Sequence, residues 1–296
     1  MKVRGRARSY VTCEQSVSLP VALIMCFLLF VAGYYSATSL LQDPLDDFSF
    51  PSVQRQKLLQ SDSSGEAFVV VDHGKSGDNN IQISPFQVLS WRPRILLFPN
   101  FADVRQCKAI IALAKSRLAP SSLALRKGET SENTKDIRTS SGTFLSANED
   151  RTGTLAWVED KMARATLIPR THGEAFNVLR YELGQKYNCH YDYFDPQEYG
   201  PQKSQRMASF LLYLSDVEEG GETMFPYEDY KNMNVGYDFK QCIGLKVKPR
   251  QGDAILFYSM FPNGTFDKTS LHGSCPVIKG EKWVATKWIR NTEDWA

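Results

Sequence analysis

Short runs of aromatic and branched residues dominate the chain from residue 175 to residue 290, and they most constrain its fold. Gly, Pro, Asp and Asn separate these runs, which read AFNVLRYE, HYDYF, MASFLLYLSD, GLKVKP, DAILFYS and KWVATKWI. Repeated short strands with turn residues between them are typical of β-sandwiches and β-barrels. The sequence therefore predicts that this part of the chain is built mainly from β-strands.

Two segments upstream of these runs have the spacing of helices. After a strand-like run at 94–101, apolar residues recur every three or four positions, as they do on one face of a helix: Val104, Cys107, Ile111, Ala114 and Leu118. A second helix is expected from Thr154 to Leu167, because Pro169 stops it. Together these elements predict an α+β, mainly β fold in which the helices pack on one sheet.

An uncharged apolar segment lies near the N-terminus. No charged residue occurs between Glu14 and Asp43, and the stretch from Val17 to Tyr35 is long enough to cross a bilayer as a helix. Basic residues precede it and acidic residues follow it, so the positive-inside rule places the N-terminus in the cytosol. We expect a cytosolic tail at 1–16, a transmembrane signal anchor at 17–37, a lumenal stem at 38–85 and a folded domain at 86–296. A cleaved signal peptide is the alternative.

Cysteines and a glycosylation sequon follow this segment. The cysteines beyond it are Cys107, Cys189, Cys242 and Cys275, and disulfides persist in the secretory pathway. Four cysteines allow three full pairings, and their spacing leaves the choice open. Asn263 begins an Asn-Gly-Thr sequon, which is used only in the lumen. We therefore expect a single-pass type II protein of the endoplasmic reticulum or Golgi membrane with a lumenal folded domain.

The charge balance argues against one class of partner. The chain carries 35 Lys and Arg residues against 33 Asp and Glu residues, and four of the basic residues precede the apolar segment. The remainder is close to neutral, whereas phosphate binding needs a surplus of Lys and Arg gathered on one face. Nucleic acid is therefore disfavoured as a partner.

Two histidines and an aspartate suggest a metal site. His190 and Asp192 are two residues apart in HYDYF, so on an extended strand their side chains share one face. His272 precedes Gly273, which lets a backbone or a ligand approach closely. Two imidazoles and one carboxylate form the facial triad of non-haem Fe(II) oxygenases. Taken alone, His190 and Asp192 are equally compatible with a surface strand that carries two polar residues.

A lysine ten residues after His272 points to an anionic cosubstrate. Lys282 opens the run KWVATKWI, in which Lys282, Val284, Thr286 and Trp288 share one face. A lysine beside a metal ion is repelled unless an anion lies between them. A dicarboxylate such as 2-oxoglutarate fits, because its 2-oxo acid end chelates iron while its distal carboxylate pairs with the lysine. The structural alternative is an edge-strand lysine that reaches into solvent, as Lys287 on the opposite face is expected to do.

The segments RTSSGTFL, VLRYELGQKYNCHYDYF, EEGGETMFP, KPRQGDAILFYS and HGSCPVIKGEKWVATKWI, between Arg138 and Arg290, closely resemble the membrane-anchored plant prolyl 4-hydroxylases. The resemblance covers over half of the chain. It implies a double-stranded β-helix, or jelly roll, that uses Fe(II), 2-oxoglutarate, O2 and L-ascorbate. It also implies hydroxylation of peptidyl proline in the secretory pathway, on proline-rich polypeptides such as cell-wall glycoproteins.

The resemblance also implies roles for individual residues. The iron ligands are His190, Asp192 and His272; Lys282 binds 2-oxoglutarate, with help from Tyr181 and Thr223; and Tyr187, Arg206 and Trp288 contact the peptide. Arg206 is equally suited to pair with a carboxylate of the protein. A disulfide between Cys242 and Cys275 is implied, whereas Cys189 departs from the small residue usual before the first iron-ligand histidine. RTSSGTFL resembles a mobile loop that closes over substrate.

Other functions remain open at this level. One alternative is a 2-oxoglutarate oxygenase that acts on lysine or on a small molecule, and another is a non-catalytic, lectin-like module with a structural metal. The chain lacks the length for the separate peptide-binding domain of the animal collagen enzyme. No obligate partner subunit is therefore expected.

Overall fold

The computed structural model describes residues 85–234 and 241–293, together with scattered positions before residue 83. The chain divides into two compact units, Met1–Gln82 and Ile83–Ala296. In the first unit, β1 (Gln60–Ser61) pairs with β2 (Ala67–Phe68) and β3 (Val70–Val71) pairs with β4 (Ile81–Gln82). The expected tail, anchor and stem lie outside the described residues except for these strands and four helical positions, Met25, Phe27, Leu28 and Val31. Among the described residues, no helix is both long and apolar enough to span a bilayer.

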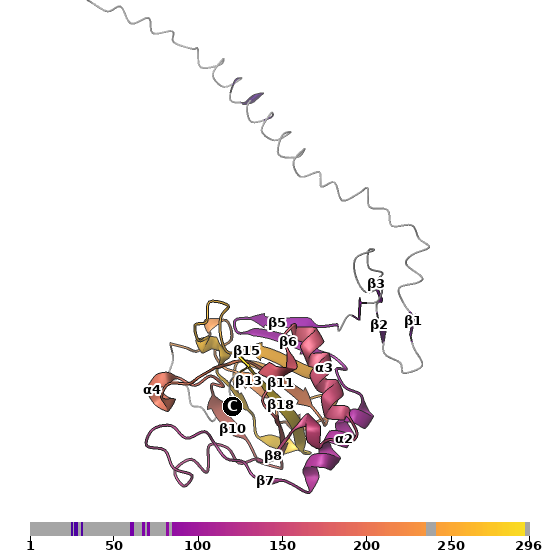
Figure 1. Ribbon diagram of the computed structural model, residues 1–296. Helices are drawn as coiled ribbons and strands as arrows, with labels where there is room; N and C mark the ends of the chain where they lie inside the picture. Colours follow the sequence, from indigo (N-terminus) through magenta and orange to yellow (C-terminus); the bar gives the residue numbers. More distant parts are fainter. Residues whose placement is uncertain are drawn as a thin grey trace, which may run out of the picture. The chain divides into compact units, whose positions relative to one another are not determined.

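A large antiparallel sheet forms the frame of the second unit (Figure 1). In spatial order its eight described strands are β5 (Gln87–Trp91), β6 (Arg94–Phe98), β15 (Ala254–Tyr258), β11 (Arg206–Tyr213), β18 (Lys282–Arg290), β9 (Phe176–Tyr181), β8 (Ser141–Leu145) and β7 (Ala119–Pro120). Five of these strands contain runs that the sequence predicts as strands. The aromatic and branched pattern therefore located most of this sheet correctly.

A smaller sheet faces the large one. Its strands, in order, are β10 (Tyr187–His190), β16 (His272–Ser274), β13 (Thr223–Phe225) and β14 (Leu245–Val247), and β12 (Glu219–Gly220) pairs separately with β17 (Val277–Lys279). From β9 to β18 the chain passes repeatedly between the two sheets, so that β9, β18, β11 and β15 oppose β10, β16, β13 and β14. Two facing four-stranded antiparallel sheets of this kind make a jelly roll. The expected mainly β architecture is confirmed.

Two helices cover the outer face of the large sheet (Figure 1). They are α2 (Val104–Lys115) and α3 (Thr154–Thr166), close to the predicted bounds. The Asp103 side chain caps α2 by accepting a hydrogen bond from the Gln106 backbone N–H. The Gln106 side chain in turn accepts a hydrogen bond from the Asp103 backbone N–H. The remaining short helices are α4 (Pro196–Tyr199) and the 3-10 turns η2 (Ala147–Glu149), η3 (Arg170–His172), η4 (Glu228–Tyr230) and η5 (Lys268–Ser270).

The large sheet separates two apolar cores. The outer core joins the helices to the sheet and includes Ile110, Val158 and Phe210. The inner core fills the space between the two sheets and includes Tyr213, Phe225 and Phe257. Because side chains alternate along each strand, one strand supplies both cores. The site described below opens from the inner side.

Candidate metal centre and substrate groove

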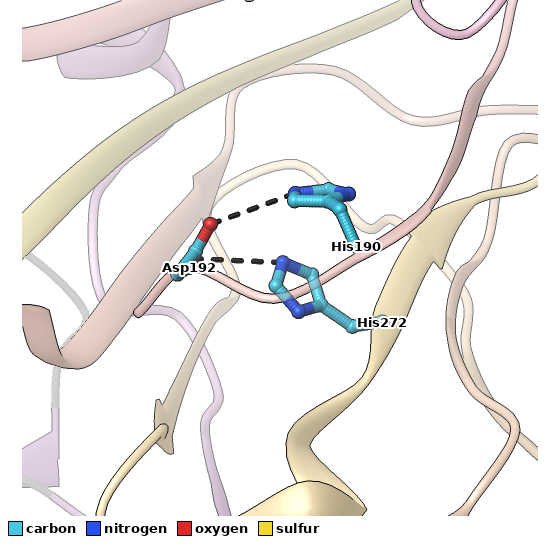
Figure 2. A group of neighbouring side chains, drawn as sticks. All are labelled: His190, Asp192 and His272. Carbon is cyan, nitrogen blue, oxygen red and sulfur yellow. Dashed lines mark ion pairs between the residues drawn. The ribbon is translucent and has the colours of Figure 1, made fainter. Parts of the chain in front are cut away.

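His190, Asp192 and His272 converge at one end of the small sheet, as Figure 2 shows. His190 ends β10 and His272 begins β16, and the two residues are direct partners in the ladder between these strands. Asp192 does not lie on a strand, contrary to the sequence-based expectation, because β10 ends at His190. The turn after β10 brings the Asp192 carboxylate 3.5 Å from Nε2 of His190 and 3.6 Å from Nε2 of His272.

Backbone carbonyls fix the orientation of both imidazoles. Nδ1 of His190 lies 2.9 Å from the carbonyl oxygen of Asn188, and Nδ1 of His272 lies 3.0 Å from that of Ser270. A carbonyl oxygen only accepts hydrogen bonds, so each Nδ1 carries a proton, and in the neutral ring Nε2, on the side of Asp192, then holds the lone pair. This is the tautomer in which histidine binds a metal through Nε2.

Burial and mutual attraction set the charges of these groups. Burial alone raises the pKa of the Asp192 carboxyl, but His272 and His190 beside it bring that pKa well below its usual range. Burial lowers the pKa of His272 to about 4, although Asp192 opposes this shift. A carboxylate beside two imidazoles is a donor set that suits a divalent cation. One ligand atom from each residue lies within 4.8 Å of the others, so the cluster fits an Fe(II) ion held by two histidines and one carboxylate.

Lys282 lies deeper in the same pocket and is only 1% exposed. It begins β18 opposite Tyr181 on β9, and its ammonium nitrogen donates a hydrogen bond to Ser274 Oγ at 2.9 Å. Burial lowers the pKa of Lys282 to about 7, and Glu222 partly offsets this effect. Among the described residues, no carboxylate lies within ion-pair distance of this ammonium group. A buried cation without a carboxylate partner is a binding position for an anionic ligand.

Hydroxyl groups surround the lysine. Tyr213 donates its hydroxyl to Thr223 Oγ1 at 2.8 Å, and both residues are buried. Burial raises the pKa of Tyr181, whose ring centre lies 5.3 Å from the Lys282 ammonium nitrogen. These phenols therefore stay protonated and act as hydrogen-bond donors. The polar groups of Lys282, Thr223 and Tyr181 together suit a carboxylate ligand.

The pocket follows the inner face of β18. It is lined by Lys282, Val284, Thr286 and Trp288 of this strand, which confirms the predicted alternation. Lys287 on the other face does not reach into solvent, so that expectation was wrong. It is 4% exposed and pairs with Glu159 of α3, because β18 lies at the centre of the sheet and not at its edge.

A wider groove runs from the metal cluster to the surface. The Tyr187 ring stacks on the His190 ring with their centres 3.7 Å apart, and Trp288 lines both the groove and the inner pocket. Phe144, which is 54% exposed, extends this aromatic wall and lies 6.4 Å from Trp288 between ring centres. An open aromatic groove suits a polymer chain better than a small molecule.

Arg206 lies between an aromatic ring and a carboxylate. Its guanidinium carbon is 3.6 Å from the Trp288 ring centre, and Nε and one terminal nitrogen donate to the two oxygens of Glu174 at 2.7 and 2.8 Å. Glu174 also accepts a hydrogen bond from Nε of Arg290 at 2.6 Å. Of the two expectations for Arg206, pairing with a carboxylate of the protein is the one that is observed.

Comparison with known proteins reveals the family. Residues 176–290 match the family model described as the 2OG-Fe(II) oxygenase superfamily. The chain is 61% identical over 293 residues to probable prolyl 4-hydroxylase 9 of Arabidopsis thaliana. The match covers 98% of this chain and 99% of that one. The protein belongs to the prolyl 4-hydroxylases. Prolyl 4-hydroxylase 13 of the same plant is 52% identical to this chain, and the match covers 96% of this chain and 98% of the relative.

Among solved structures, this prolyl 4-hydroxylase is similar to a viral collagen prolyl hydroxylase from Paramecium Bursaria Chlorella virus-1, determined as a 2-oxoglutarate complex. The two chains are 27% identical with a TM-score of 0.49, and the match covers 67% of this chain and 96% of the viral one.

One expectation about the edge of the groove was wrong. Part of the segment RTSSGTFL, at Ser141–Leu145, is strand β8, which pairs along its whole length with β9. It is not a loop, because its backbone completes the large sheet. The longer stretch between β7 and β8 borders the groove instead.

Two of the cysteines of this prolyl 4-hydroxylase lie next to the metal cluster in the sequence: Cys189 precedes His190, and Cys275 follows β16, which begins with His272. Cys242 and Cys275 form a disulfide with Cα atoms 5.7 Å apart, whereas Cys107 and Cys189 form no disulfide with another described cysteine. Asn263 is exposed in a turn, where its side-chain oxygen accepts hydrogen bonds from the backbone and hydroxyl of Thr265.

Sequence reasoning missed several residues of the site. Arg138 is buried against the Tyr187 ring at 4.7 Å, Ser274 holds Lys282, and Ser209 contacts Asp192. Arg138 opens a segment that the family resemblance had already marked, so that resemblance was the only available signal. The two serines carry no distinguishing pattern, because they lie within short runs without a spacing of their own.

Proposed function

We propose that this prolyl 4-hydroxylase binds Fe(II) through His190, Asp192 and His272 and 2-oxoglutarate through Lys282. The observation that carries this assignment is one pocket that holds both a metal-binding cluster and a buried lysine without a carboxylate partner. When bound, iron and 2-oxoglutarate supply the oxidising chemistry: one oxygen atom of O2 enters proline C4, and the other enters succinate as CO2 leaves. L-Ascorbate is the proposed reductant that keeps the iron in the Fe(II) state.

The protein's own residues position the two reactants. The charged Lys282 pairs with the distal carboxylate of 2-oxoglutarate, while hydroxyl groups of Tyr181 and Thr223 donate hydrogen bonds to it. This pairing fixes the distance of the 2-oxo acid end from the metal ligands. Lys282, Asp192 and His272 are buried, and the low local dielectric strengthens these interactions.

The open groove supports a polypeptide substrate. The faces of Tyr187 and Trp288 suit the rings of a proline-rich segment in an extended left-handed helix. Arg206 is held rigid by Glu174 and offers its remaining N–H groups to peptide carbonyl oxygens. We propose proline-rich secretory proteins, such as cell-wall glycoproteins, as the substrates, with no obligate partner subunit and no nucleic-acid partner.

One experiment tests the reaction. The purified full-length chain is supplied with Fe(II), 2-oxoglutarate, ascorbate and O2, together with either a proline-rich peptide or its matched version with alanine at each proline and one added lysine. We expect succinate to form in step with one added oxygen per modified proline. Oxygen added to the lysine peptide, or succinate formed equally without any peptide, would contradict the assignment.

We also propose that the chain is a type II protein of the endoplasmic reticulum or Golgi membrane, anchored by residues 17–37. The uncharged segment, the basic residues before it, the disulfide and the exposed sequon support this proposal. Carbonate extraction of membranes should retain the full-length chain, and protease added outside intact vesicles should spare the region after residue 37. Release of a soluble chain that begins near residue 40 would indicate a cleaved signal peptide.

A further inference from the structure

The Asp192 carboxylate has a contact that its role as a metal ligand does not explain. Ser209 donates its hydroxyl hydrogen to Oδ2 of Asp192, and both residues are buried. We propose that Ser209 is a positioning residue for the metal: it occupies one carboxylate oxygen and thereby limits Asp192 to a single coordination position. This inference rests on the proposed function for the identity of the metal.

Ser209 lies in the interior of the large sheet. It lies in the middle of β11, where it pairs with Phe257 of β15 on one side and with Trp288 of β18 on the other. It is fully buried, and Leu211 and Tyr213 of the same strand face, like Ser209, toward the inner core. The hydroxyl is therefore fixed by the centre of the large sheet.

Asp192 needs such support because its own backbone does not lie in a strand. It follows β10 in a turn, whereas both imidazoles are fixed on strands and by backbone carbonyls. Oδ1 of Asp192 lies 3.5 Å from Nε2 of His190, and Oδ2, the oxygen bound by Ser209, lies 3.6 Å from Nε2 of His272. With Oδ2 held by the sheet, Oδ1 is the oxygen left for the metal.

The consequence concerns the positions left open on the metal. A facial triad leaves three positions, which a chelating cosubstrate and O2 require. A carboxylate that binds through both oxygens takes one of these positions. Removing a hydrogen bond to a ligating group commonly weakens metal affinity by about 10- to 100-fold. The Ser209 hydroxyl is thus expected to control both the affinity and the open geometry of the site.

A matched pair of variants separates the hydroxyl from the shape of the side chain. Ser209→Thr keeps the hydroxyl, whereas Ser209→Val introduces a side chain of the same shape as threonine but without the hydroxyl. Fe(II) affinity is measured anaerobically in the full-length chain without peptide or 2-oxoglutarate, and the charge-transfer absorption band of the Fe(II)–2-oxoglutarate complex is then recorded. We expect Ser209→Val to weaken Fe(II) binding by about 10- to 100-fold and to shift the band, and Ser209→Thr to restore both.

Ser259→Ala is the control. Ser259 follows β15 and is also fully buried, and its hydroxyl has no hydrogen-bond partner among the described residues. It should leave Fe(II) affinity and the absorption band unchanged. If Ser209→Val does not fold, Ser209→Ala makes the same comparison with Ser259→Ala, because both variants remove only a buried hydroxyl.

Two outcomes would overturn the inference. One is equal Fe(II) affinity and an equal absorption band in the Ser209→Thr and Ser209→Val variants. The other is a loss of affinity in Ser259→Ala as large as that in Ser209→Ala. A wild-type chain that binds Fe(II) but leaves proline peptides unmodified would contradict the proposed function instead, because the affinity measurement needs no substrate.

Discussion

The ammonium nitrogen of Lys282 and the hydroxyl oxygen of Ser274 are 2.9 Å apart inside the pocket that also holds the metal-binding cluster. Ser274 is the residue before Cys275, and His272 lies on the same short strand, so β16 links the lysine, the disulfide and the metal-binding cluster. The first prediction follows from the charge of this lysine.

Binding of 2-oxoglutarate should depend on pH. The pKa of Lys282 is lowered to about 7 by burial, so the neutral amine predominates above that pH when no anion is bound. Because the carboxylate requires the charged form, affinity should be constant below pH 7 and fall by up to about tenfold per pH unit above it. Calorimetry on the anaerobic Fe(II)-loaded chain measures this. Lys282→Met should bind weakly at every pH, whereas Ser274→Ala should keep the slope; a flat wild-type profile would contradict the assignment.

Removal of any one proposed iron ligand should abolish hydroxylation without unfolding the domain. His190→Ala, Asp192→Ala and His272→Ala each leave only two protein ligands, too few for a stable facial site. His172→Gln is the control, because His172 is not part of the metal cluster: its Nδ1 lies 2.8 Å from the Arg290 carbonyl oxygen and its Nε2 lies 3.8 Å from Glu293. Fe(II) titration checks the loss of metal binding, and circular dichroism checks that the domain stays folded. Substantial turnover by any of the three alanine variants would argue against the triad.

The arginine at the groove should act on the peptide and not on 2-oxoglutarate. Arg206→Lys loses the two-pronged contact with Glu174 and the planar stack on Trp288. A hydrogen bond to a charged group is worth about 1.5 to 3 kcal/mol, so KM for a proline-rich peptide should rise about tenfold or more. KM for 2-oxoglutarate should not change. Equal increases in both constants would point to a general disturbance of the fold.

The disulfide should matter for both stability and metal binding. It closes a loop across a sequence separation of 33, which corresponds to about 3 to 4 kcal/mol on the chain-entropy model. Cys242→Ser, Cys275→Ser and the double variant should lose the same amount, because each removes the same bridge. All three should also weaken Fe(II) binding, since Cys275 follows β16, which begins with His272. Peptide mapping without reduction tests the pairing, and a different linkage would refute it.

Asn263 should carry a glycan if the folded domain is lumenal. Asn263→Gln and Thr265→Ala should remove the same glycosidase-sensitive mass in plant microsomes, because both residues are required by the sequon. Neither variant should change the peptide KM, as Asn263 does not line the groove. An unmodified wild-type asparagine in protein recovered from microsomes would remove this support for a lumenal domain.

Local pattern located most strands of the large sheet and both long helices, because periodicity reports which side of an element is buried. Phe176–Tyr181 and Lys282–Arg290 were both found in this way. The position of Asp192 was missed because a strand end depends on pairing with a partner, and the β10 and β16 ladder contains an irregularity. Residue spacing within HYDYF carries no information about that partner.

Contacts between residues far apart in the sequence were also missed by the sequence-based prediction. Lys287 pairs with Glu159, 128 residues earlier, and nothing near either residue in the sequence indicates the other. The approach of His272 to His190 was likewise suggested by chemistry and by family resemblance, not by periodicity. Arg206 shows the same limit, because both of its predicted partners were chemically reasonable and only the fold brings Glu174 beside it.

β18, the last strand among the described residues, lies in the middle of the large sheet, between β11 and β9. During synthesis, β9 and β11 therefore emerge with unpaired edges and stay incomplete until residue 290 has left the ribosome. Unpaired edges favour aggregation, and pairing between distant segments is slow. The large sheet can therefore close only after β18 has emerged, and until then the exposed edges of β9 and β11 are sites at which molecular chaperones can protect the nascent chain.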